Sequence, residues 1–131
     1  MRKITAPRVL PEAHAYWDAA SEGRLLVKRC AACGQVHHYP RDICPFCLSA
    51  DTHWIEATGG GTLYSFSTMG QGDAAYTLAM VTLDEGVTMM TNLVDCDPAA
   101  ARIGDRVRVL FHPTEGGPAV PVFTLAAGGA A

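Results

Sequence analysis

The hydrophobic positions near the start of the chain repeat with the period of a helix. The apolar stripe consists of Leu10, Ala13, Trp17 and Ala20. Pro11 suits the first turn of a helix, and Gly23 is a suitable C-terminal stop. The pattern therefore predicts a helix over residues 10–22, and the stretch 24–29 that follows is typical of a short strand.

Beyond residue 61 the pattern changes from helical to β. The predicted strands cover residues 62–69, 76–83, 87–94, 106–112 and 120–125. Asp84-Glu85-Gly86 is a good hairpin turn between the second and third strands. Asp97 can cap a single helical turn over residues 97–101, before the fourth strand. Five strands with a helical turn between the third and fourth match an OB barrel, with an SH3-like barrel as the nearest competitor.

Four of the five cysteines form two close pairs. Their spacing is Cys30-x2-Cys33-x10-Cys44-x2-Cys47. Each pair offers two thiolates at one corner, and two such corners complete the tetrahedron that zinc prefers. Iron in a rubredoxin-type site would use the same ligands, whereas a thioredoxin-like site needs one pair near a βαβ pattern. The spacing therefore favours a structural zinc ion, and a closed shell of four thiolates leaves no position for hydrolytic chemistry.

Together these patterns predict a mainly β protein with an N-terminal helix, a rubredoxin-like zinc ribbon and a C-terminal five-stranded OB-fold barrel. The expected divisions are a helical segment over residues 1–23, the ribbon over 24–50, the barrel over 51–125 and a flexible tail over 126–131. The glycine run 59–61 lacks the Gly-Lys-Ser/Thr ending of a phosphate loop. We expect it to form a flexible entry to the barrel or a bulge.

Composition limits the class of protein. Hydrophobic residues make up 49% of the 131 residues and charged residues 18%, which is typical of a globular protein. No apolar run approaches the roughly 20 residues that span a bilayer, and the start of the chain lacks the apolar core of a signal peptide. We therefore expect an intracellular, cytoplasmic protein whose cysteines stay reduced, which favours metal binding over disulfides.

The net charge of −3 conceals an asymmetry. Residues 1–47 carry seven Lys/Arg against four Asp/Glu, and residues 48–131 carry three against nine. Nucleic-acid affinity depends largely on Lys and Arg, so the acidic barrel makes single-strand binding the least favoured alternative. The cations that flank the ribbon are Arg24, Lys28, Arg29 and Arg41. They either offset the charge of a zinc–thiolate centre or bind a phosphorylated ligand such as coenzyme A.

Several short motifs, each weak alone, together resemble the zinc-ribbon/OB-fold family associated with acyl-CoA enzymes. In the first half of the chain they are Tyr16-Trp17, Gly23-Arg24-Leu25, Arg29-Cys30, Cys33-Gly34, Tyr39-Pro40-Arg41, Cys44-Pro45, Cys47, Trp54 and Gly61-Thr62-Leu63-Tyr64-Ser65-Phe66. Those in the second half are Leu83-Asp84-Glu85-Gly86, Asn92-Leu93-Val94 and Ile103-Gly104-Asp105. The resemblance spans nearly the whole chain.

The resemblance implies a non-catalytic accessory subunit in a hetero-oligomer with a thiolase-superfamily enzyme, such as a thiolase, an aldolase or an acyltransferase. Such a subunit helps to assemble the complex, shape the substrate channel and bind CoA or acyl-CoA. By the same resemblance, Tyr16, Trp17 and the ribbon face near Arg41 are candidate contacts for the partner or CoA, although Trp17 can equally pack between helix and barrel. The sequence offers no Cys–His catalytic pair. A stand-alone CoA-thioester-binding protein is the alternative.

Overall fold

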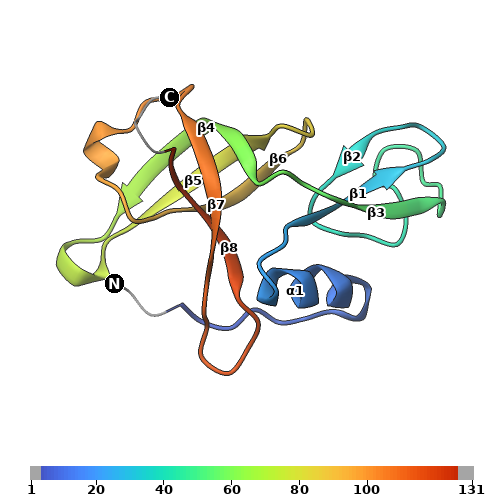
Figure 1. The fold of residues 1–131 in the computed structure, drawn as a ribbon, viewed down its shortest axis with the longest axis horizontal. Helices are drawn as coiled ribbons and strands as arrows, with labels where there is room; N and C mark the ends of the chain where they lie inside the picture. Colours follow the sequence, from blue (N-terminus) through green and yellow to red (C-terminus); the bar gives the residue numbers. More distant parts are fainter. Residues whose placement is uncertain (1–3, 127–131) are drawn as a thin grey trace.

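A computed structural model describes residues 4–126 of the chain (Figure 1). The predicted N-terminal helix consists of a 3-10 turn, Pro11–Ala13 (η1), and an α-helix, His14–Ser21 (α1). Gly23 follows it with φ at +82°, in the left-handed region that favours glycine at a helix end. The helix and its glycine stop are therefore confirmed.

The ribbon is built on a three-stranded antiparallel sheet. Its central strand β1, Leu26–Cys30, lies between β2, Val36–His37, and β3, Thr52–Glu56. β3 pairs with β1 along its whole length. The expected division at residue 51 assigns this strand to the barrel, whereas the structure pairs it with the ribbon, because the chain returns alongside β1 before it enters the barrel. The sheet of the ribbon thus extends to residue 56.

The second half of the chain forms a closed five-stranded barrel, which confirms the predicted fold class. Its strands are β4, Gly60–Met69; β5, Tyr76–Leu83; β6, Thr88–Leu93; β7, Arg106–His112; and β8, Val120–Leu125. They close in the order β4-β5-β6-β8-β7, in which β6 and β8 are parallel. Two short 3-10 turns lie between strands, Gly72–Ala74 (η2) and Pro98–Ala100 (η3), and the backbone N–H of Ala99 donates to the Asp97 carboxylate at 2.9 Å.

One continuous core joins the helix, the ribbon and the barrel. Tyr16 and Trp17 of α1 belong to the same buried cluster as Val27 of β1, Val81 of β5 and Phe123 of β8. In Figure 1, α1 lies beside the ribbon and β8, and it packs against β1 and β8. The helix therefore holds the ribbon against one side of the barrel. Of the predicted tail over 126–131, residues 127–131 lie outside the described part of the chain.

The glycine run is a point of close packing, which corrects the expected flexible entry. A Cβ at Gly61 would lie 2.8 Å from the backbone oxygen of Thr82, and one at Gly59 would lie 2.7 Å from the Val109 side chain. The bulge in β4 comes later, between Leu63 and Ser65. Glycine is required here because neighbouring strands approach the backbone too closely for a side chain.

Candidate metal centre and neighbouring surfaces

The four predicted ligands converge at one end of the ribbon. The Sγ atoms of Cys30, Cys33, Cys44 and Cys47 all lie within 4.8 Å of one another. The Cys30–Cys47 pair is separated by 3.5 Å and the Cys33–Cys44 pair by 3.7 Å. Zn–S bonds of about 2.3 Å in a tetrahedron place sulfurs about 3.8 Å apart, so the cluster fits zinc. A zinc ion would cross-link the two pairs and supply structure rather than a reactive position.

Two tight turns, which we call the cysteine knuckles, present these thiolates: the first runs from Cys30 to Gly34 and the second from Cys44 to Leu48, and both have the same backbone hydrogen bond. In the first, the backbone N–H of Gly34 donates to the Cys30 carbonyl at 2.8 Å, and in the second that of Leu48 donates to the Cys44 carbonyl at 2.9 Å. Both Gly34 and Leu48 have positive φ, at +78° and +67°. A residue in the left-handed region thus follows each cysteine pair, a glycine after the first and a leucine after the second.

A backbone hydrogen bond also favours the thiolate form of one of the four ligands, Cys30. The backbone N–H of Cys33 lies 3.5 Å from the Cys30 sulfur and donates to it. That hydrogen bond is the main cause that lowers the pKa of the Cys30 thiol to about 7, against the opposing effect of burial. Cys30 and Cys44 are buried, whereas Cys33 and Cys47 are exposed. The centre therefore lies at the surface with one thiolate of each pair inside the protein.

The four candidate cations do not form one site. Arg24 is exposed and pairs with Glu22 at 2.9 Å and with Glu56 at 3.3 Å. Lys28 is only 7% exposed, and its ammonium lies 4.7 Å from the centre of the Trp54 ring. Neighbouring residues on a strand point to opposite faces, so Arg29 lies on the other side of the sheet from Lys28.

Arg29 and Arg41 differ in what surrounds them. Among the described residues, the exposed Arg29 side chain has no ion-pair or hydrogen-bond partner. Arg41 is half-exposed, lies 3.6 Å from a carboxylate oxygen of Glu12, and stacks near the Tyr39 ring. Of the four, Arg29 is thus the one whose charge is not already offset by a carboxylate or covered by the sheet.

Tyr16 and Trp17, the candidate partner contacts, lie inside the molecule. They are 2% and 8% exposed, and their rings meet edge to face at 4.9 Å. Trp17 Nε1 donates to the Tyr39 hydroxyl at 2.6 Å, and the Tyr16 hydroxyl lies 2.9 Å from His38 Nε2. Burial raises the pKa of Tyr16, and it lowers the pKa of His38 to about 4. These four rings fasten α1 to the loop after β2.

Sequence patterns did not single out His38 or its neighbour His37 as important. His37 is 3% exposed; its Nε2 accepts the backbone N–H of Arg41 at 3.3 Å, and its Nδ1 has no partner in the described structure. Burial lowers the pKa of His37 as well. No spacing rule links His38 to Tyr16, because the two residues meet only when the ribbon loop folds back over the helix.

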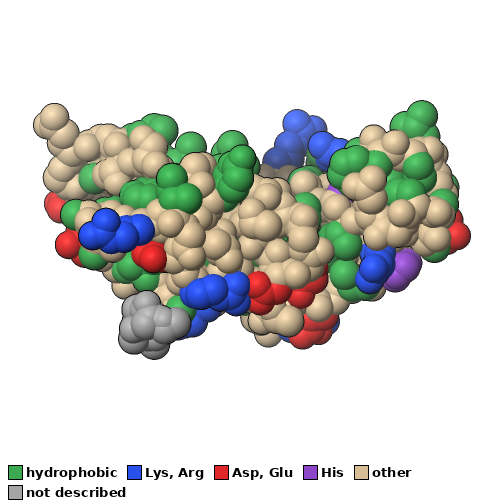
Figure 2. Space-filling model, turned by 90° about the horizontal axis from the view of Figure 1, so that it is seen from above, with side chains coloured by type: hydrophobic (Ala, Val, Ile, Leu, Met, Phe, Trp, Pro, Cys, Tyr) green, Lys and Arg blue, Asp and Glu red, His purple; other side chains and the backbone are tan. Residues whose placement is uncertain are grey.

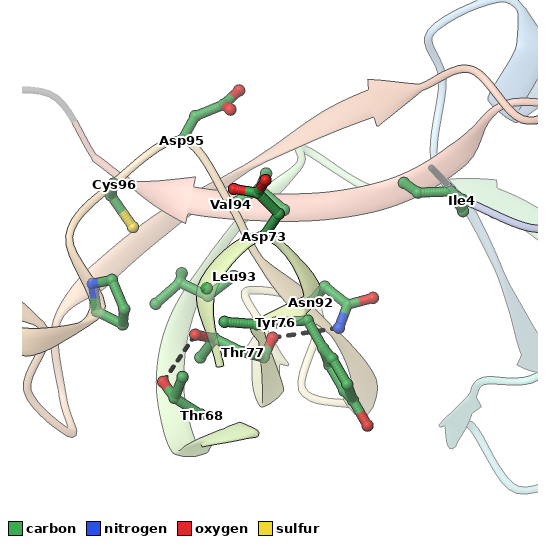
Figure 3. Close-up of a pocket in the computed structure, with 13 residues that line it drawn as sticks. Ile4, Thr68, Asp73, Tyr76, Thr77, Asn92, Leu93, Val94, Asp95 and Cys96 are labelled. Atoms are coloured by element: carbon green, nitrogen blue, oxygen red, sulfur yellow. Dashed lines mark hydrogen bonds between the residues drawn. The ribbon is translucent and has the colours of Figure 1, made fainter. Parts of the chain in front are cut away.

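A cavity of about 440 Å³ opens at one end of the barrel (Figure 3). Its lining includes Asp73 of η2, Tyr76 of β5, Asn92 of β6, and Cys96 after it. Asn92 Nδ2 donates to a backbone oxygen at 3.2 Å, and a pair of threonine hydroxyls bonds across the same wall. Cys96 is partly buried here, and no histidine is among the lining residues, so the cavity offers no Cys–His pair.

Charges on the surface are dispersed. In the view of Figure 2, Lys and Arg side chains are scattered over the molecule and do not gather into one patch, and Asp and Glu interrupt them. An interface that follows a phosphate backbone needs a continuous basic stripe, which this face lacks. Within residues 4–126, no helix is long and apolar enough to cross a membrane.

Comparison with known proteins identifies related chains. A DUF35 domain-containing scaffold protein of Methanothermobacter thermautotrophicus is 33% identical over 67% of this chain and 71% of its own length. A protein of Thermomonospora curvata named "Probable enoyl-CoA hydratase alpha subunit" is 35% identical over 84% of this chain. That match covers 36% of the hydratase subunit, so the chain spans about a third of this relative.

Solved structures and family descriptions agree. A chain of the structure described as "Ltp2-ChsH2(DUF35) aldolase" superposes with a TM-score of 0.82 and 32% identity, over 92% of this chain and 99% of that one. A DUF35 protein of unknown function from Sulfolobus solfataricus shares the fold, with a TM-score of 0.65 at 10% identity. Residues 17–53 match the ChsH2 rubredoxin-like zinc ribbon domain, and residues 54–112 match the ChsH2 C-terminal OB-fold domain. The chain belongs to the ChsH2 (DUF35) family, in which a zinc ribbon is joined to an OB fold.

Proposed function

We propose that the chain is a non-catalytic accessory subunit of a thiolase-superfamily enzyme that makes or breaks carbon–carbon bonds in acyl-CoA substrates. The observation that carries the proposal is the match over 99% of the chain in the structure described as an Ltp2-ChsH2(DUF35) aldolase. The name "scaffold protein" of the archaeal relatives supports the same role. The chain would contribute assembly and part of the substrate channel, and the partner would contribute the chemistry.

The chemistry of the described residues supports a non-catalytic role. The four clustered cysteines fill a closed metal shell, which leaves no open position for water or substrate. The remaining cysteine, Cys96, has no histidine beside it in the barrel-end cavity. Reaction with an acyl-CoA would therefore need groups from another subunit.

Purification of the untagged protein from its native cells tests the proposal. We expect it to elute with an enzyme that mass spectrometry identifies as a thiolase-superfamily member, at a constant ratio across the peak. The recombinant pair should turn over an acyl-CoA substrate, and this chain alone should not. Recovery of the chain as a lone monomer at high protein concentration would contradict the proposal.

Direct contact with coenzyme A is a second proposal, favoured by the unpaired Arg29 on the ribbon. The Arg29 guanidinium is free to bind a phosphate, whereas the side chains of Arg24 and Lys28 already lie next to carboxylates. Arg41 lies partly exposed on the same ribbon. Arg108, an exposed arginine on β7 of the barrel, provides the control. In calorimetry with the assembled complex, Arg29→Ala should weaken the binding of CoA more than Arg108→Ala does. Equal affinities for the two variants would remove Arg29 from the site.

A further inference from the structure

The side chains on the outer face of β4, β5 and β6 are themselves uncharged, and one ion pair from neighbouring segments, Arg106–Asp84, reaches the Thr62 corner, where Arg106 donates to Thr62 Oγ1 at 3.3 Å. The strand registers set the side chains of this face in rows: Thr62–Thr82–Thr88, Ser65–Met80–Met90, Ser67–Leu78–Asn92 and Met69–Tyr76. We call these residues, together with Tyr64 at the bulge, the uncharged face. None of the three strands contains Asp, Glu, Lys, Arg or His. The next strand of the barrel, β7, carries Arg106, Arg108 and His112.

Large apolar side chains project from this face. Tyr64 is 63% exposed and Met90 is 62% exposed. The bulge between Leu63 and Ser65 takes Tyr64 out of the regular ladder, and bulges commonly redirect a side chain in this way. An antiparallel sheet that faces only water usually alternates apolar residues inside with polar or charged residues outside. On the outer side of these strands half of the side chains are Thr, Ser or Asn, as expected for a strand that faces water, but the other half are Met, Leu or Tyr where charged residues are usual.

Within residues 4–126 no helix packs over the middle of this face, although Ile4 and Asp73 lie around the cavity beside its end residues Tyr76 and Asn92. The α-helix of the described residues, α1, packs against β1 and β8, and Figure 1 shows it on the ribbon side of the molecule, away from β5 and β6. The face continues onto a neighbouring segment, because the backbone N–H of Gly104 donates to the Leu63 carbonyl at 2.8 Å. Ile103, immediately before it, is 71% exposed. A further exposed apolar side chain therefore lies in the segment that borders β4.

We infer that the uncharged face is where the catalytic subunit docks, an inference that rests on the accessory role proposed above. Away from the Thr62 corner, a charged side chain of a partner would be desolvated against this face without a counter-charge, so the matching surface of the partner should be uncharged, with apolar groups opposite the Met and Tyr side chains and hydrogen-bonding groups opposite the Thr, Ser and Asn side chains. Met80 and Met90 are flexible, polarisable side chains that adapt to such a surface, and Tyr64 is a suitable aromatic anchor.

The size of the face favours a larger partner over a second copy of this chain. With eight residues in β5, at about 3.4 Å per residue and about 4.8 Å between strands, the face measures about 27 by 14 Å, or about 400 Å². A stable interface buries about 800 Å² on each side. Two copies stacked face to face would fall short of this area, whereas a larger subunit can cover the face and Ile103 together.

A matched pair of variants tests the inference. Met90→Glu places a carboxylate on the β6 row of the face, where Met90 is 62% exposed, and Ala15→Glu places one at an exposed position of α1, away from the face and from the cysteine knuckles. Both sites are exposed, so both variants should keep the wild-type melting temperature and zinc content. We expect Met90→Glu to weaken binding of the purified catalytic subunit by about 30-fold or more, and Ala15→Glu by less than about threefold.

Oxidative footprinting gives a second readout that needs no variant. Met90 and Tyr64 should be oxidised readily in the free protein and protected in the complex, while Phe46 stays reactive in both. If wild-type protein binds the enzyme but Met90→Glu binds as tightly, the inference is overturned and the accessory role stands. If Ala15→Glu alone disrupts the complex, α1 lies in the interface and the inference is overturned. If wild-type protein binds no such enzyme, the proposed function itself fails.

Discussion

Burial of His38 makes the stability of this protein depend on pH in a calculable way. The side chain packs between Tyr16 and Tyr39, and burial lowers its pKa from 6.5 to about 4. In the unfolded chain the imidazole returns to its ordinary pKa. As pH falls below 6.5, the unfolded state therefore binds a proton that the folded state does not take up until about pH 4, so stability is lost across that window.

The expected magnitude follows from the size of the pKa shift. One pKa unit corresponds to about 1.4 kcal/mol, so the full window from 6.5 to 4 is worth about 3 kcal/mol. Most of this stability is lost above pH 5. Between pH 7 and pH 5 the contribution of His38 to the free energy of unfolding should decrease by about 2 kcal/mol. Above pH 7 the histidine is neutral in both states and contributes no pH dependence.

Urea unfolding at pH 7, 6 and 5 measures this effect, with His38→Gln as the perturbation. Protonation of the zinc thiolates also destabilises the fold at low pH, but it is common to both proteins and cancels in their difference. The free energy of unfolding of the wild type should fall by about 2 kcal/mol more than that of the variant. His14→Gln, at an exposed position of α1, should behave like the wild type.

NMR titration of the imidazole supplies an independent check on the folded protein. The His38 resonances should remain those of a neutral ring at pH 5. A midpoint near 6.5, or wild-type and His38→Gln unfolding energies that fall in parallel, would refute the assignment of the pH dependence to this buried ring.

Three further perturbations probe the packing and the metal centre. Cys44→Ser should abolish stoichiometric zinc binding, measured by elemental analysis, and unfold the ribbon, whereas retained zinc would contradict the four-thiolate shell. Gly61→Ala should lower the free energy of unfolding by about 1–3 kcal/mol, because the new Cβ would lie 2.8 Å from the rigid backbone of β5. Gly60→Ala should cost less, because the atoms nearest to its Cβ are the ends of side chains that can move. Equal melting temperatures for the two variants would refute this difference. Tyr39→Phe leaves the buried Nε1 of Trp17 without its acceptor and should cost about 1–3 kcal/mol by urea unfolding, with no change in zinc content.

The strand pattern shows how much of the fold can be predicted from local sequence. All five predicted barrel strands are present, because runs of β-branched and aromatic residues bounded by turn residues mark strands locally, and in residues 106–112 apolar and polar residues also alternate. The turn at Gly86, with φ at +96°, and the Asp97 cap were recognisable because each depends on residues adjacent in the chain. The assignment of β3 to the ribbon was not, because its pairing partner β1 lies more than twenty residues earlier.

The candidate surfaces divide in the same way. The zinc ligands follow from spacing, since a Cys-x2-Cys turn sets the geometry of each pair. The cations flanking the ribbon form a cluster only in the sequence: strand alternation separates Lys28 from Arg29, and Glu22 and Glu56 engage Arg24. The uncharged face was also hidden, because Tyr64, Met80 and Met90 become neighbours only through strand register and a bulge.

The sequence by itself therefore determined the metal centre and the order of elements, because thiolate spacing, hydrophobic period and turn residues act over a few positions along the chain. Only the tertiary structure decided which side chains share a surface. Burial turned Tyr16 and Trp17 inward against His38 and Tyr39, and closure of the barrel placed β4, β5 and β6 side by side, with α1 of residues 4–126 packed elsewhere, on β1 and β8. Such outcomes depend on long-range packing, in which residues distant in the chain compete for the same core.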